Sequence, residues 1–563
     1  MLFRSAQLAS KINQQLVEPL PPSILYEYSS LNSLASWLAS EQAPALKGKA
    51  PDAVQPNNNK HLQKLTSNPE LLEKSDEQEV QLSPPPPKSQ PRPSGINSSN
   101  LLAHKPLEIA VVGMTCRFPG ARNLAEYWSL LAEGKNSISP VPPERWSSEI
   151  PFYAGLIDNI SDFDPAFFLI RPEDAKVMDP QALLVLEESL NLFYHAGYTL
   201  EEIKGGMTGV YLGARSQHRV DEADLYHARN PIVAAPNYLA THISQFFDLK
   251  GPSLVVDTAC SSALVAMYFA IQSLLSGEIN SAVVGGVSLL ADAVAHRIFQ
   301  QRNLLNQSSL FHVFDGRASG ITLGEGVGLV LLKTLEQAQR DGDQIYAVIK
   351  GLAINNDGRT AGPATPNIEA LKEVMQRALT QSGKQPQDIA HIEANGSGSE
   401  VTDLLELKAI EAIYRRETKN PCSLGSIKPN IGHPLCAEGI AGFIKLVCML
   451  QYKQFVPFLS GQIPLIHYDI EASPFYFCRQ SSVWPTASSL VGLNCFADGG
   501  TNAHVIMEGW SQPESSKQRQ PITPPTLKRV NVRGNLLSQE TITEENVSQD
   551  SEEFNHNPWW DDR

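Results

Sequence analysis

In the middle of the chain the sequence reads Asp257-Thr258-Ala259-Cys260-Ser261-Ser262-Ala263-Leu264. A short apolar run at 254–256 comes before this stretch, and good helix formers continue through 263–275 up to Gly277. The pattern predicts that Cys260 lies between a buried strand and the N-terminus of a helix. Unpaired N–H groups there carry partial positive charge, so we expect a lowered thiol pKa and a nucleophile that can take an acyl group.

The other cysteines are expected to be small buried hydrophobes. They are Cys116, Cys422, Cys436, Cys448, Cys478 and Cys495, and the seven cysteines form no CxxC pair. This spacing favours reduced thiols over a disulfide framework or a zinc site, and we expect no metal. The N-terminus shows no secretory h-region, so a cytoplasmic location is the expectation.

Seven further apolar runs surround the Cys260 stretch and alternate with helical segments. They lie at 109–112, 209–212, 282–284, 327–332, 347–349, 389–393 and 505–507. Continuous apolar strands of this kind belong to sheets that are covered on both faces. Residues 107–510 are therefore predicted to form a layered α/β/α architecture.

Six motifs of this region occur in the order of one enzyme family. They are Ile109-Ala110-Val111-Val112-Gly113-Met114-Thr115-Cys116-Arg117-Phe118-Pro119-Gly120, Met178-Asp179-Pro180-Gln181, the Cys260 stretch, Gly324-Glu325-Gly326, Ser426-Ile427-Lys428-Pro429-Asn430-Ile431-Gly432-His433, and Gly499-Gly500-Thr501-Asn502-Ala503-His504. With them, the region resembles a β-ketoacyl synthase domain of a modular polyketide synthase. The resemblance implies an α/β, thiolase-like fold with α/β/α/β/α layers, and a homodimer. In the family the cysteine accepts an acyl chain from a carrier protein, and two histidines assist decarboxylation of a malonyl unit whose carbanion attacks the thioester.

The resemblance also assigns roles to single residues. Cys260 matches the nucleophile, His433 the second active-site histidine, and Lys428 the lysine that orders the site. Glu325 and Asn430 stand in family motifs, and we expect them to be structural residues near the site. The resemblance implies no bound cofactor, because phosphopantetheine would arrive on partner acyl carrier proteins.

The first active-site histidine is replaced by Asn395. The family reads Glu-Ala-His-Gly-Thr-Gly-Thr here, whereas this chain reads Glu393-Ala394-Asn395-Gly396-Ser397-Gly398-Ser399. Four residues suggest that the loop keeps its usual shape: Ser397 and Ser399, which are expected to bind substrate, and the acidic pair Asp403 and Glu406. His391 is rejected as a substitute, because four residues along a strand span roughly 13 Å.

Loss of this histidine affects the two half-reactions differently. Thioester formation on Cys260 needs a thiolate, an oxyanion hole and a positioned donor, and none of these requires the first histidine. Decarboxylation builds an enolate oxygen that needs donors placed in advance, and losing one donor costs on the order of 100- to 1000-fold in rate. An Asn amide donates a hydrogen bond, but it cannot take up a proton or carry a positive charge. We therefore expect transacylation to persist and condensation to be crippled.

A second departure from the family lies at Asp498, where the family has a phenylalanine whose backbone N–H helps to form the oxyanion hole. We expect the N–H to be kept, and two roles for the carboxylate stay open. It places negative charge beside a developing oxyanion and an arriving malonyl group, or it points toward Lys428 or solvent and is neutral in effect. His504 is expected to be structural rather than catalytic.

These residues predict a non-elongating ketosynthase, which accepts an acyl chain on Cys260 and passes it to another carrier protein without extending it. The expected partners are acyl carrier proteins and other polyketide synthase modules. Two alternatives stay open: an inactive scaffold or chain-length-type subunit that pairs with an active synthase, and a condensing synthase that tolerates Asn395. Retention of Cys260 argues against the scaffold.

The ends of the chain differ from the central region. Residues 1–43 show two amphipathic helical patterns and resemble the back half of an acyl carrier protein, without the Asp-Ser pair that bears phosphopantetheine; a docking helical hairpin is the alternative. Residues 44–106 are Pro-rich and predict a flexible linker. Residues 511–563 predict a disordered acidic tail, whose paired tryptophans are a candidate docking segment.

Charge and hydropathy exclude two classes of function. The net charge is −15, and Lys and Arg are nowhere clustered, which argues against nucleic-acid binding. The most apolar stretches noted, near 283–295 and 326–332, are shorter than the roughly 20 residues that cross a bilayer. We therefore expect no nucleic-acid partner and no membrane span.

Overall fold

The computed structural model describes residues 107–146, 151–216, 227–228, 231–360, 362, 365–415, 421–484, 489–511 and 518–533. All of them belong to one compact unit, Pro106–Arg563. The predictions for residues 1–43, for residues 44–106 and for the tail beyond residue 533 fall outside the described residues.

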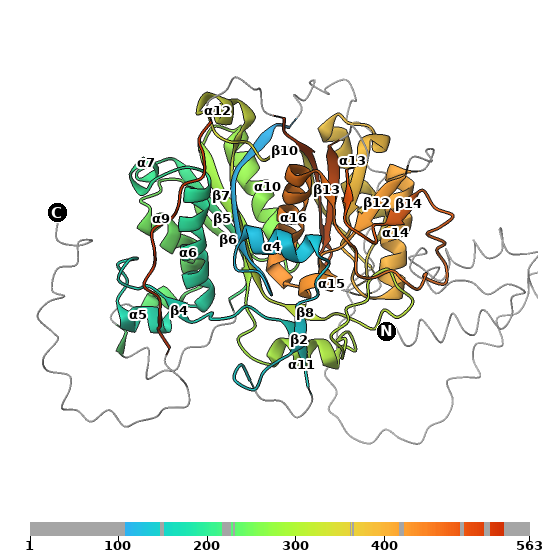
Figure 1. Cartoon of the computed structure of the whole chain (residues 1–563), viewed down its shortest axis with the longest axis horizontal. Helices are drawn as coiled ribbons and strands as arrows, with labels where there is room; N and C mark the ends of the chain where they lie inside the picture. Colours follow the sequence, from blue (N-terminus) through green and yellow to red (C-terminus); the bar gives the residue numbers. More distant parts are fainter. Residues whose placement is uncertain are drawn as a thin grey trace, which may run out of the picture. The chain divides into compact units, whose positions relative to one another are not determined.

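The centre of this unit is an eleven-stranded mixed sheet (Figure 1). From edge to edge its strands are β14 (Phe475–Phe477), β12 (Cys422–Gly425), β11 (Ile389–Glu393), β16 (Leu490–Phe496), β17 (Thr501–Gly509), β10 (Ala347–Asn356), β1 (Ile109–Arg117), β9 (Gly326–Thr334), β7 (Ser281–Ser288), β5 (Thr208–Ala214) and β6 (Ser253–Val256). The middle strands pair antiparallel, with Ile109 opposite Ile349 between β1 and β10, whereas strands toward both edges pair in parallel. Each predicted apolar run, including 254–256, lies in one of these strands, which confirms the α/β prediction.

The described helices and smaller sheets complete the unit. The α-helices are α4 (Leu124–Ala132), α5 (Pro172–Val177), α6 (Pro180–His195), α7 (Leu200–Ile203), α9 (Tyr238–Phe246), α10 (Ser262–Leu275), α11 (Val294–Gln301), α12 (Leu335–Arg340), α13 (Ile368–Ser382), α14 (Glu400–Tyr414), α15 (Lys428–Ile431) and α16 (Glu438–Tyr452). Three 3-10 helices are η3 (Pro231–Ala234), η4 (Pro386–Asp388) and η5 (Leu435–Ala437). The smaller sheets join β2 (Ile138–Pro140), β3 (Tyr153–Gly155) and β8 (Leu323–Gly324); β13 (Gln454–Phe455) and β15 (Ser482–Val483); and β4 (Asp162–Phe163) and β18 (Val530–Asn531).

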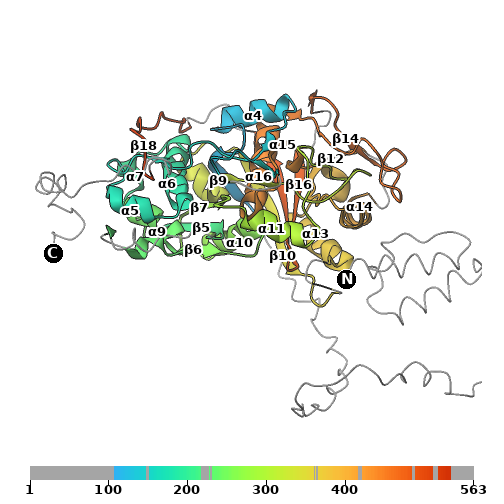
Figure 2. The same ribbon diagram turned by 90° about the horizontal axis from the view of Figure 1, so that it is seen from below.

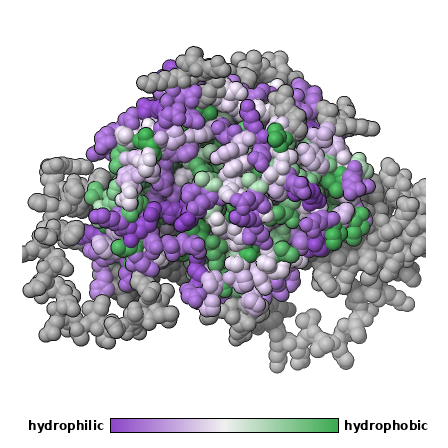
Figure 3. Space-filling view, viewed as in Figure 1, coloured by the Kyte–Doolittle hydropathy of each residue, from purple (hydrophilic) through white to green (hydrophobic). Residues whose placement is uncertain are grey.

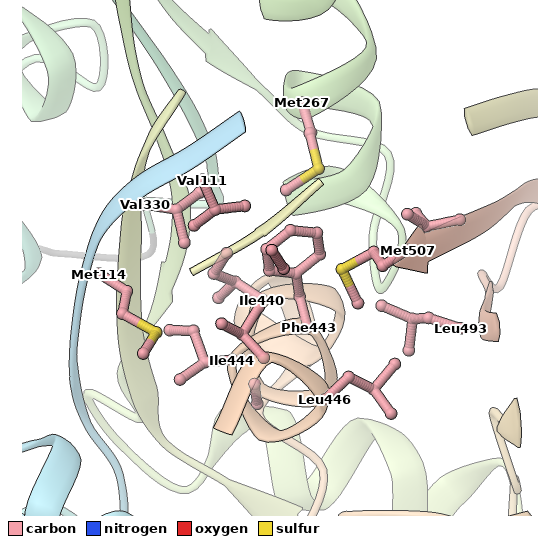
Figure 4. Packing of buried hydrophobic residues seen from close by; sticks show 14 of the residues in the cluster. Val111, Met114, Met267, Val330, Ile440, Phe443, Ile444, Leu446, Leu493 and Met507 are labelled. Carbon is pink, nitrogen blue, oxygen red and sulfur yellow. The ribbon is translucent and has the colours of Figure 1, made fainter. Parts of the chain in front are cut away.

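Helices cover both faces of the large sheet, as the alternation along β1 shows. Ile109 and Val111 pack in the cluster that contains α10 and α16, whereas Ala110 and Val112 pack against α6 and α9. In Figure 4 Phe443 of α16 and its neighbours fill the space between α10 and the strands. On the other half of the sheet, α13 and α14 cover the outer face. The two inner helices α10 and α16 each place an N-terminal end in the candidate site.

Part of the C-terminal segment folds back onto the unit, so the prediction of a disordered tail from residue 511 is wrong for residues 518–533. β18 pairs antiparallel with β4, and Arg529 Nε lies 3.1 Å from Glu187 Oε2 on α6. Arg519 Nη1 lies 2.8 Å from Glu202 Oε1 on α7. In Figures 1 and 2 this dark red segment runs beside α6 and α7. Apolar periodicity could not predict this segment, because its contacts are ion pairs, backbone bonds and a few isolated apolar side chains such as Leu527 and Val532.

One apolar stretch, Leu435–Tyr452, is long and apolar enough to cross a membrane by length and composition. In the structure 83% of it is buried, and it forms η5 and the inner helix α16. Its hydropathy is therefore that of a helix in the protein core. On the face shown in Figure 3, hydrophobic residues form small separate groups among hydrophilic ones.

Candidate active site

Cys260 lies in the turn between β6 and α10, as the sequence predicts, but the prediction that the preceding strand is buried is wrong, because β6 is a partly exposed strand at the edge of the sheet. The preceding residue, Ala259, has a positive φ of 57°, and the Ala259 N–H donates to Asp257 Oδ1 at 3.0 Å. The Thr258 N–H donates to Ser262 Oγ at 2.9 Å, which ties the turn to the first residue of α10. Gly213 of β5 lets the helix approach closely, since a Cβ there would lie 2.3 Å from the Ala263 nitrogen. The sulfur is thus held in one place by a tight strand-to-helix turn.

His433 faces this sulfur. Its Nε2 lies 3.1 Å from Cys260 Sγ, although 173 residues separate the two in sequence. His433 follows the short helix α15 and Gly432, whose φ is 77°. Its backbone N–H donates to the Thr322 carbonyl at 2.7 Å, and its carbonyl accepts from the Gly324 N–H at 2.9 Å. The backbone bonds on both sides fix the ring within hydrogen-bond reach of the thiol.

The expectation of a lowered Cys260 pKa is wrong. Burial raises the pKa of this thiol to about 12, the nearby Glu438 carboxylate raises it further, and Lys428 and the Asp498 backbone N–H lower it only in part. Desolvation of the thiolate outweighs the helix N-terminus. Burial, together with Lys428, also holds the pKa of His433 well below its ordinary value. At neutral pH the pair is therefore a neutral thiol beside a neutral imidazole, and His433 can act as general base.

Glu438, the first residue of α16, belongs to this group, and the sequence reading missed it. Its Oε1 lies 2.6 Å from Lys428 Nζ, and its Oε2 lies 3.3 Å from His433 Nδ1. Burial raises the pKa of its carboxyl to about 6. The usable signal was an acidic residue in the first turn of an apolar helix, five positions after the histidine.

The groups Cys260, His433 and Glu438 also offer three possible metal ligands within 4.8 Å of one another. His433, however, lies between the other two, with Nε2 toward the sulfur and Nδ1 toward the carboxylate. A ring that presents a different nitrogen to each neighbour suits a proton relay better than a shared metal. The Glu438 carboxylate lies 3.3 Å from Nδ1 but makes no hydrogen bond with it among the described residues, so it acts on the ring through its negative charge, which favours the imidazolium that forms when Nε2 takes the thiol proton.

Asn395 lies at the start of the loop between β11 and α14, and its amide oxygen is occupied. Oδ1 accepts from Lys428 Nζ at 3.4 Å and from the Phe496 N–H at 3.1 Å. These two donors fix the orientation of the amide, because Nδ2 in that place would face donors only. Across the described part of the chain, no acceptor is bonded to Nδ2. Asn395 therefore offers amide N–H donors, but its neutral amide cannot take up a proton or carry a positive charge.

Two buried carboxylates hold the backbone of the Asn395 loop. Glu406 accepts from the Asn395 N–H at 2.7 Å and the Gly396 N–H at 2.9 Å, and burial raises its pKa to about 7. Asp403 accepts from the Ser397 N–H at 2.6 Å and from the Ser397 hydroxyl at 2.9 Å. The Ser399 N–H in turn donates to Ser397 Oγ at 3.3 Å. The Ser397 hydroxyl is thus engaged within the loop, and substrate binding by Ser397 and Ser399 stays a prediction.

The two other histidines of interest are bound elsewhere. His391 Nε2 lies 3.4 Å from Glu393 Oε2, which also forms an ion pair with Lys445 at 2.6 Å. His504 is bonded to the Tyr414 hydroxyl at 2.5 Å and to Asn494 Oδ1 at 2.6 Å. The Asn494 amide then donates to Glu406 at 2.9 Å, so His504 reaches the Asn395 loop only through side chains that support it.

The position of the Asp498 side chain distinguishes the two roles that the sequence left open for its carboxylate. Its carboxylate forms an ion pair with Arg302 at 2.5 Å, and its backbone N–H lowers the pKa of Cys260. The carboxylate therefore points toward Arg302 rather than toward Lys428, and the guanidinium compensates its negative charge.

The two expected structural residues have backbone partners. Glu325 pairs with Arg145 and accepts from the backbone N–H groups of Ile157 and Leu290. Asn430 Nδ2 donates to the Lys135 carbonyl at 2.9 Å. Both side chains are buried and connect segments around the site.

Known proteins share this region. Residues 107–338 match the family described as Beta-ketoacyl synthase, N-terminal domain, and residues 346–462 match Beta-ketoacyl synthase, C-terminal domain. The chain is 54% identical over 528 residues to Polyketide synthase PksL of Bacillus subtilis (strain 168), across 93% of this chain and 11% of that protein. It is 31% identical over 546 residues to Polyketide synthase PksM of the same organism, across 91% of this chain and 12% of that protein. The chain thus spans far less than half the length of these curated relatives.

Solved structures of ketosynthase domains are also similar to this chain. The oxazolomycin ketosynthase domain OzmH KS8 of Streptomyces albus JA3453 is 48% identical, with a TM-score of 0.63 over 76% of this chain and 100% of that chain. The ketosynthase from module 6 of the bacillaene synthase of Bacillus subtilis 168 is 36% identical, with a TM-score of 0.67 over 72% of each chain.

Proposed function

The chain belongs to the β-ketoacyl synthase family, as a thiolase-fold ketosynthase domain of a polyketide assembly line, and we propose that it transfers acyl chains without extending them. The observation that carries this proposal is Asn395. It stands in place of the first family histidine, with its amide oxygen bonded to Lys428 and to the Phe496 N–H. On the other side of the site, Cys260 and His433 remain in contact.

In the proposed reaction the Cys260 sulfur attacks the carbonyl carbon of an acyl thioester on a carrier protein. The thiol proton moves to His433 Nε2, the new S–C bond forms, and the carrier C–S bond breaks. His433 then gives the proton to the departing carrier thiol, so atoms and charge balance. Glu438 stabilises the imidazolium that forms in between, as the third member of a triad does. The same steps in reverse, with a second carrier, release the chain unextended.

Condensation makes a further demand that Asn395 does not meet. The enolate formed on decarboxylation needs preset donors, and a neutral amide gives a weaker donor than an imidazole that can carry charge. Lys428 and the Phe496 N–H hold the amide from its oxygen side, so the amide cannot turn to offer an acceptor instead. The case against condensation therefore rests on Asn395. Asp498 adds little to it, because Arg302 compensates its charge.

The proposal includes the molecular context. Phosphopantetheine would enter as part of the partner acyl carrier proteins, with no cofactor resident on this chain, and other polyketide synthase modules would supply and receive the acyl group. A cytoplasmic location agrees with seven free cysteines, all of them buried.

A homodimer is also part of the proposal. β6 is the last strand at its edge of the sheet, and its Leu254 is 44% exposed. On the neighbouring helix α10, Phe269 is 44% and Leu275 is 53% exposed. An unpaired strand edge beside exposed apolar side chains is a typical association surface.

Intact-protein mass spectrometry tests the function directly. The protein is incubated with an acyl carrier protein that bears the acyl thioester and with a second carrier that bears malonate or a free thiol. We expect acylation of Cys260 and movement of the unchanged chain to the free thiol, and neither with Cys260→Ala. A robust β-ketoacyl product would overturn the proposal in favour of a condensing synthase. A wild-type protein that is never acylated would overturn it in favour of a scaffold.

A further inference from the structure

An ion pair joins two segments at the edge of the site. Arg302, the C-terminal capping residue of α11, bonds through Nη1 to Asp498 Oδ2 at 2.5 Å, across 196 residues of sequence. Their side chains are 35% and 38% exposed, so solvent reaches the pair. Asp498 stands in the tight turn between β16 and β17, and Cys495 near the end of β16 donates through Sγ to the Cys260 carbonyl at 3.2 Å, which places this turn beside the nucleophile. The Asp498 backbone N–H lowers the pKa of Cys260. Asp498 thus connects the partly exposed Arg302 guanidinium to the surroundings of Cys260.

The two halves of this turn are held in different ways. The Gly500 carbonyl accepts from the Asp357 N–H at 2.8 Å, and the Gly499 carbonyl accepts from Asn356 Nδ2 at 3.3 Å. Both contacts come from the end of β10 and hold the glycine half. Gly499 and Gly500 have φ of 95° and 83°, values that favour glycine and let the turn reverse sharply. Among the described residues, Arg302 is the one side chain that bonds to Asp498, in the half that carries the N–H donor.

We propose that Arg302 is a positioning residue for acyl transfer: its ion pair with Asp498 holds the turn so that the Asp498 N–H faces the reacting centre at Cys260. This inference deepens the proposed transacylation at the same site and rests on it. In the transfer step, the S–C bond forms at Cys260 while the carrier C–S bond breaks, and negative charge collects on the carbonyl oxygen. A backbone N–H aimed at that position stabilises the charge without moving. The guanidinium also offsets the Asp498 carboxylate, which would otherwise oppose a nearby anion.

The expected loss is smaller than that of a deleted donor. Removing an oxyanion donor outright costs about 100- to 1000-fold in rate. Arg302→Ala keeps the N–H and the two backbone bonds of Ala497 to Thr501 and Gly500, and it removes only the side-chain contact that orients Asp498, so we expect the acylation rate constant of Cys260 to fall about 10-fold. The apparent KM for the acyl carrier protein should stay within about twofold, because the loss concerns the transition state. A lost surface ion pair contributes little to stability, so the melting temperature should hardly change.

A charge reversal distinguishes positioning from an incidental contact. Arg302→Glu alone should lose at least as much rate as Arg302→Ala, and the pair Arg302→Glu with Asp498→Lys should recover at least half of the lost rate on a logarithmic scale. Arg122→Ala serves as the matched control, because Arg122 forms an exposed ion pair with Glu126 on α4, at 2.8 Å, and takes no part in the site. It should acylate at the wild-type rate.

The readout is the rate of Cys260 acylation by an acyl carrier protein in the full chain, with intact mass as the detector. An Arg302→Ala rate within twofold of wild type would overturn the proposal. The proposal would also be overturned if the double variant Arg302→Glu with Asp498→Lys acylated no faster than Arg302→Glu. A change confined to the KM of Arg302→Ala would overturn it too, and would assign Arg302 to carrier binding. Failure of the underlying function looks different, because wild type itself would then make an extended product or never acylate.

Discussion

Glu438→Gln removes the charge at the buried end of the relay without changing the size of the side chain. In the native protein this carboxylate lies 3.3 Å from His433 Nδ1 and 2.6 Å from Lys428 Nζ. Its partner His433 becomes an imidazolium only while the thiol proton is in transit. The substitution should therefore act on the acylation step more than on the resting site.

The size of the effect follows from the geometry. A unit charge pair at 3.3 Å is worth about 5 kcal/mol at an effective dielectric constant of about 20. Lys428 shares the same carboxylate, so about half of that value is available to stabilise the imidazolium. About 2.5 kcal/mol corresponds to about a 70-fold slower acylation. The amide also leaves the buried Lys428 ammonium without its anion, which costs about 3–5 kcal/mol of folding stability.

The pH dependence gives a second signature. Glu438 has a pKa raised to about 6, so its carboxylate is ionised above pH 6 and supports the imidazolium there. Below pH 6 it takes up a proton and the support is lost, so the wild-type rate should fall to about a tenth at pH 5. His433 stays neutral over this range because its pKa lies well below the ordinary value, and Cys260 stays protonated. Glu406, with a pKa raised to about 7, contributes a change common to both proteins.

The assay follows Cys260 acylation by an acyl thioester between pH 5 and 8, for wild type and for Glu438→Gln. Glu393→Gln is the matched control, because Glu393 forms an equally short buried ion pair with Lys445 and does not contact His433. Glu393→Gln should lose comparable stability and keep the fall in rate at low pH, shifted somewhat below pH 6 because the Glu393 charge helps to raise the pKa of Glu438. Should Glu438→Gln unfold, adding Lys428→Met removes the unpaired cation and should restore folding but not the fall in rate at low pH. The role of Glu438 in proton transfer would be refuted if Glu438→Gln acylated within threefold of the wild-type rate and its rate still fell below pH 6.

Three further predictions concern other parts of the molecule. Asn395→His should raise β-ketoacyl product formation by about 10- to 100-fold, because it restores a group that can carry a proton; no gain in product by mass spectrometry would show that more than this residue blocks condensation. Arg529→Ala should lower the free energy of unfolding in urea by up to about 1 kcal/mol, since it breaks the ion pair of the C-terminal segment with Glu187, and an unchanged midpoint would deny that segment a stabilising role. Leu254→Glu should shift the protein from dimer to monomer in light scattering, because it places a charge at the β6 edge, and a dimer of unchanged stability would place the interface elsewhere.

The sequence was sufficient for the parts of the molecule that depend on local pattern. Apolar runs of three to six residues mark the strands of this chain, and a cysteine between such a run and a stretch of helix formers is expected at a helix start. The placement of Cys260 in the turn before α10 follows from this alone. The loop at Asn395 was accessible too, since Asp403 and Glu406 are close in sequence to the backbone groups they bind.

The parts that the sequence did not predict depend on the tertiary fold. The sign of the Cys260 pKa shift depends on how completely the fold removes water from the sulfur, and burial there outweighs the helix N-terminus. The pair of Arg302 with Asp498 joins residues 196 positions apart. Glu438 is near His433 in sequence, but its second contact, to Lys428, exists only because α15 and α16 meet beside Cys260. Long-range polar contacts leave no periodicity in a sequence.

The raised pKa of Cys260 bears on the choice between transfer and condensation. A thiol with a pKa of about 12 is almost entirely protonated at neutral pH, so it reacts only where a base is in place. His433 and Glu438 supply that base and its support on one side of the sulfur. On the other side Asn395 supplies neither a base nor an acid. A site with this asymmetry can move a proton between its own thiol and a carrier thiol, which is the proton transfer that transacylation requires. It has no second proton carrier for a step that breaks a carbon–carbon bond. Removing Glu438 from the base side and restoring a histidine at Asn395 should therefore change different products, with the amount of acyl-enzyme responding to Glu438 and the amount of extended ketide responding to Asn395.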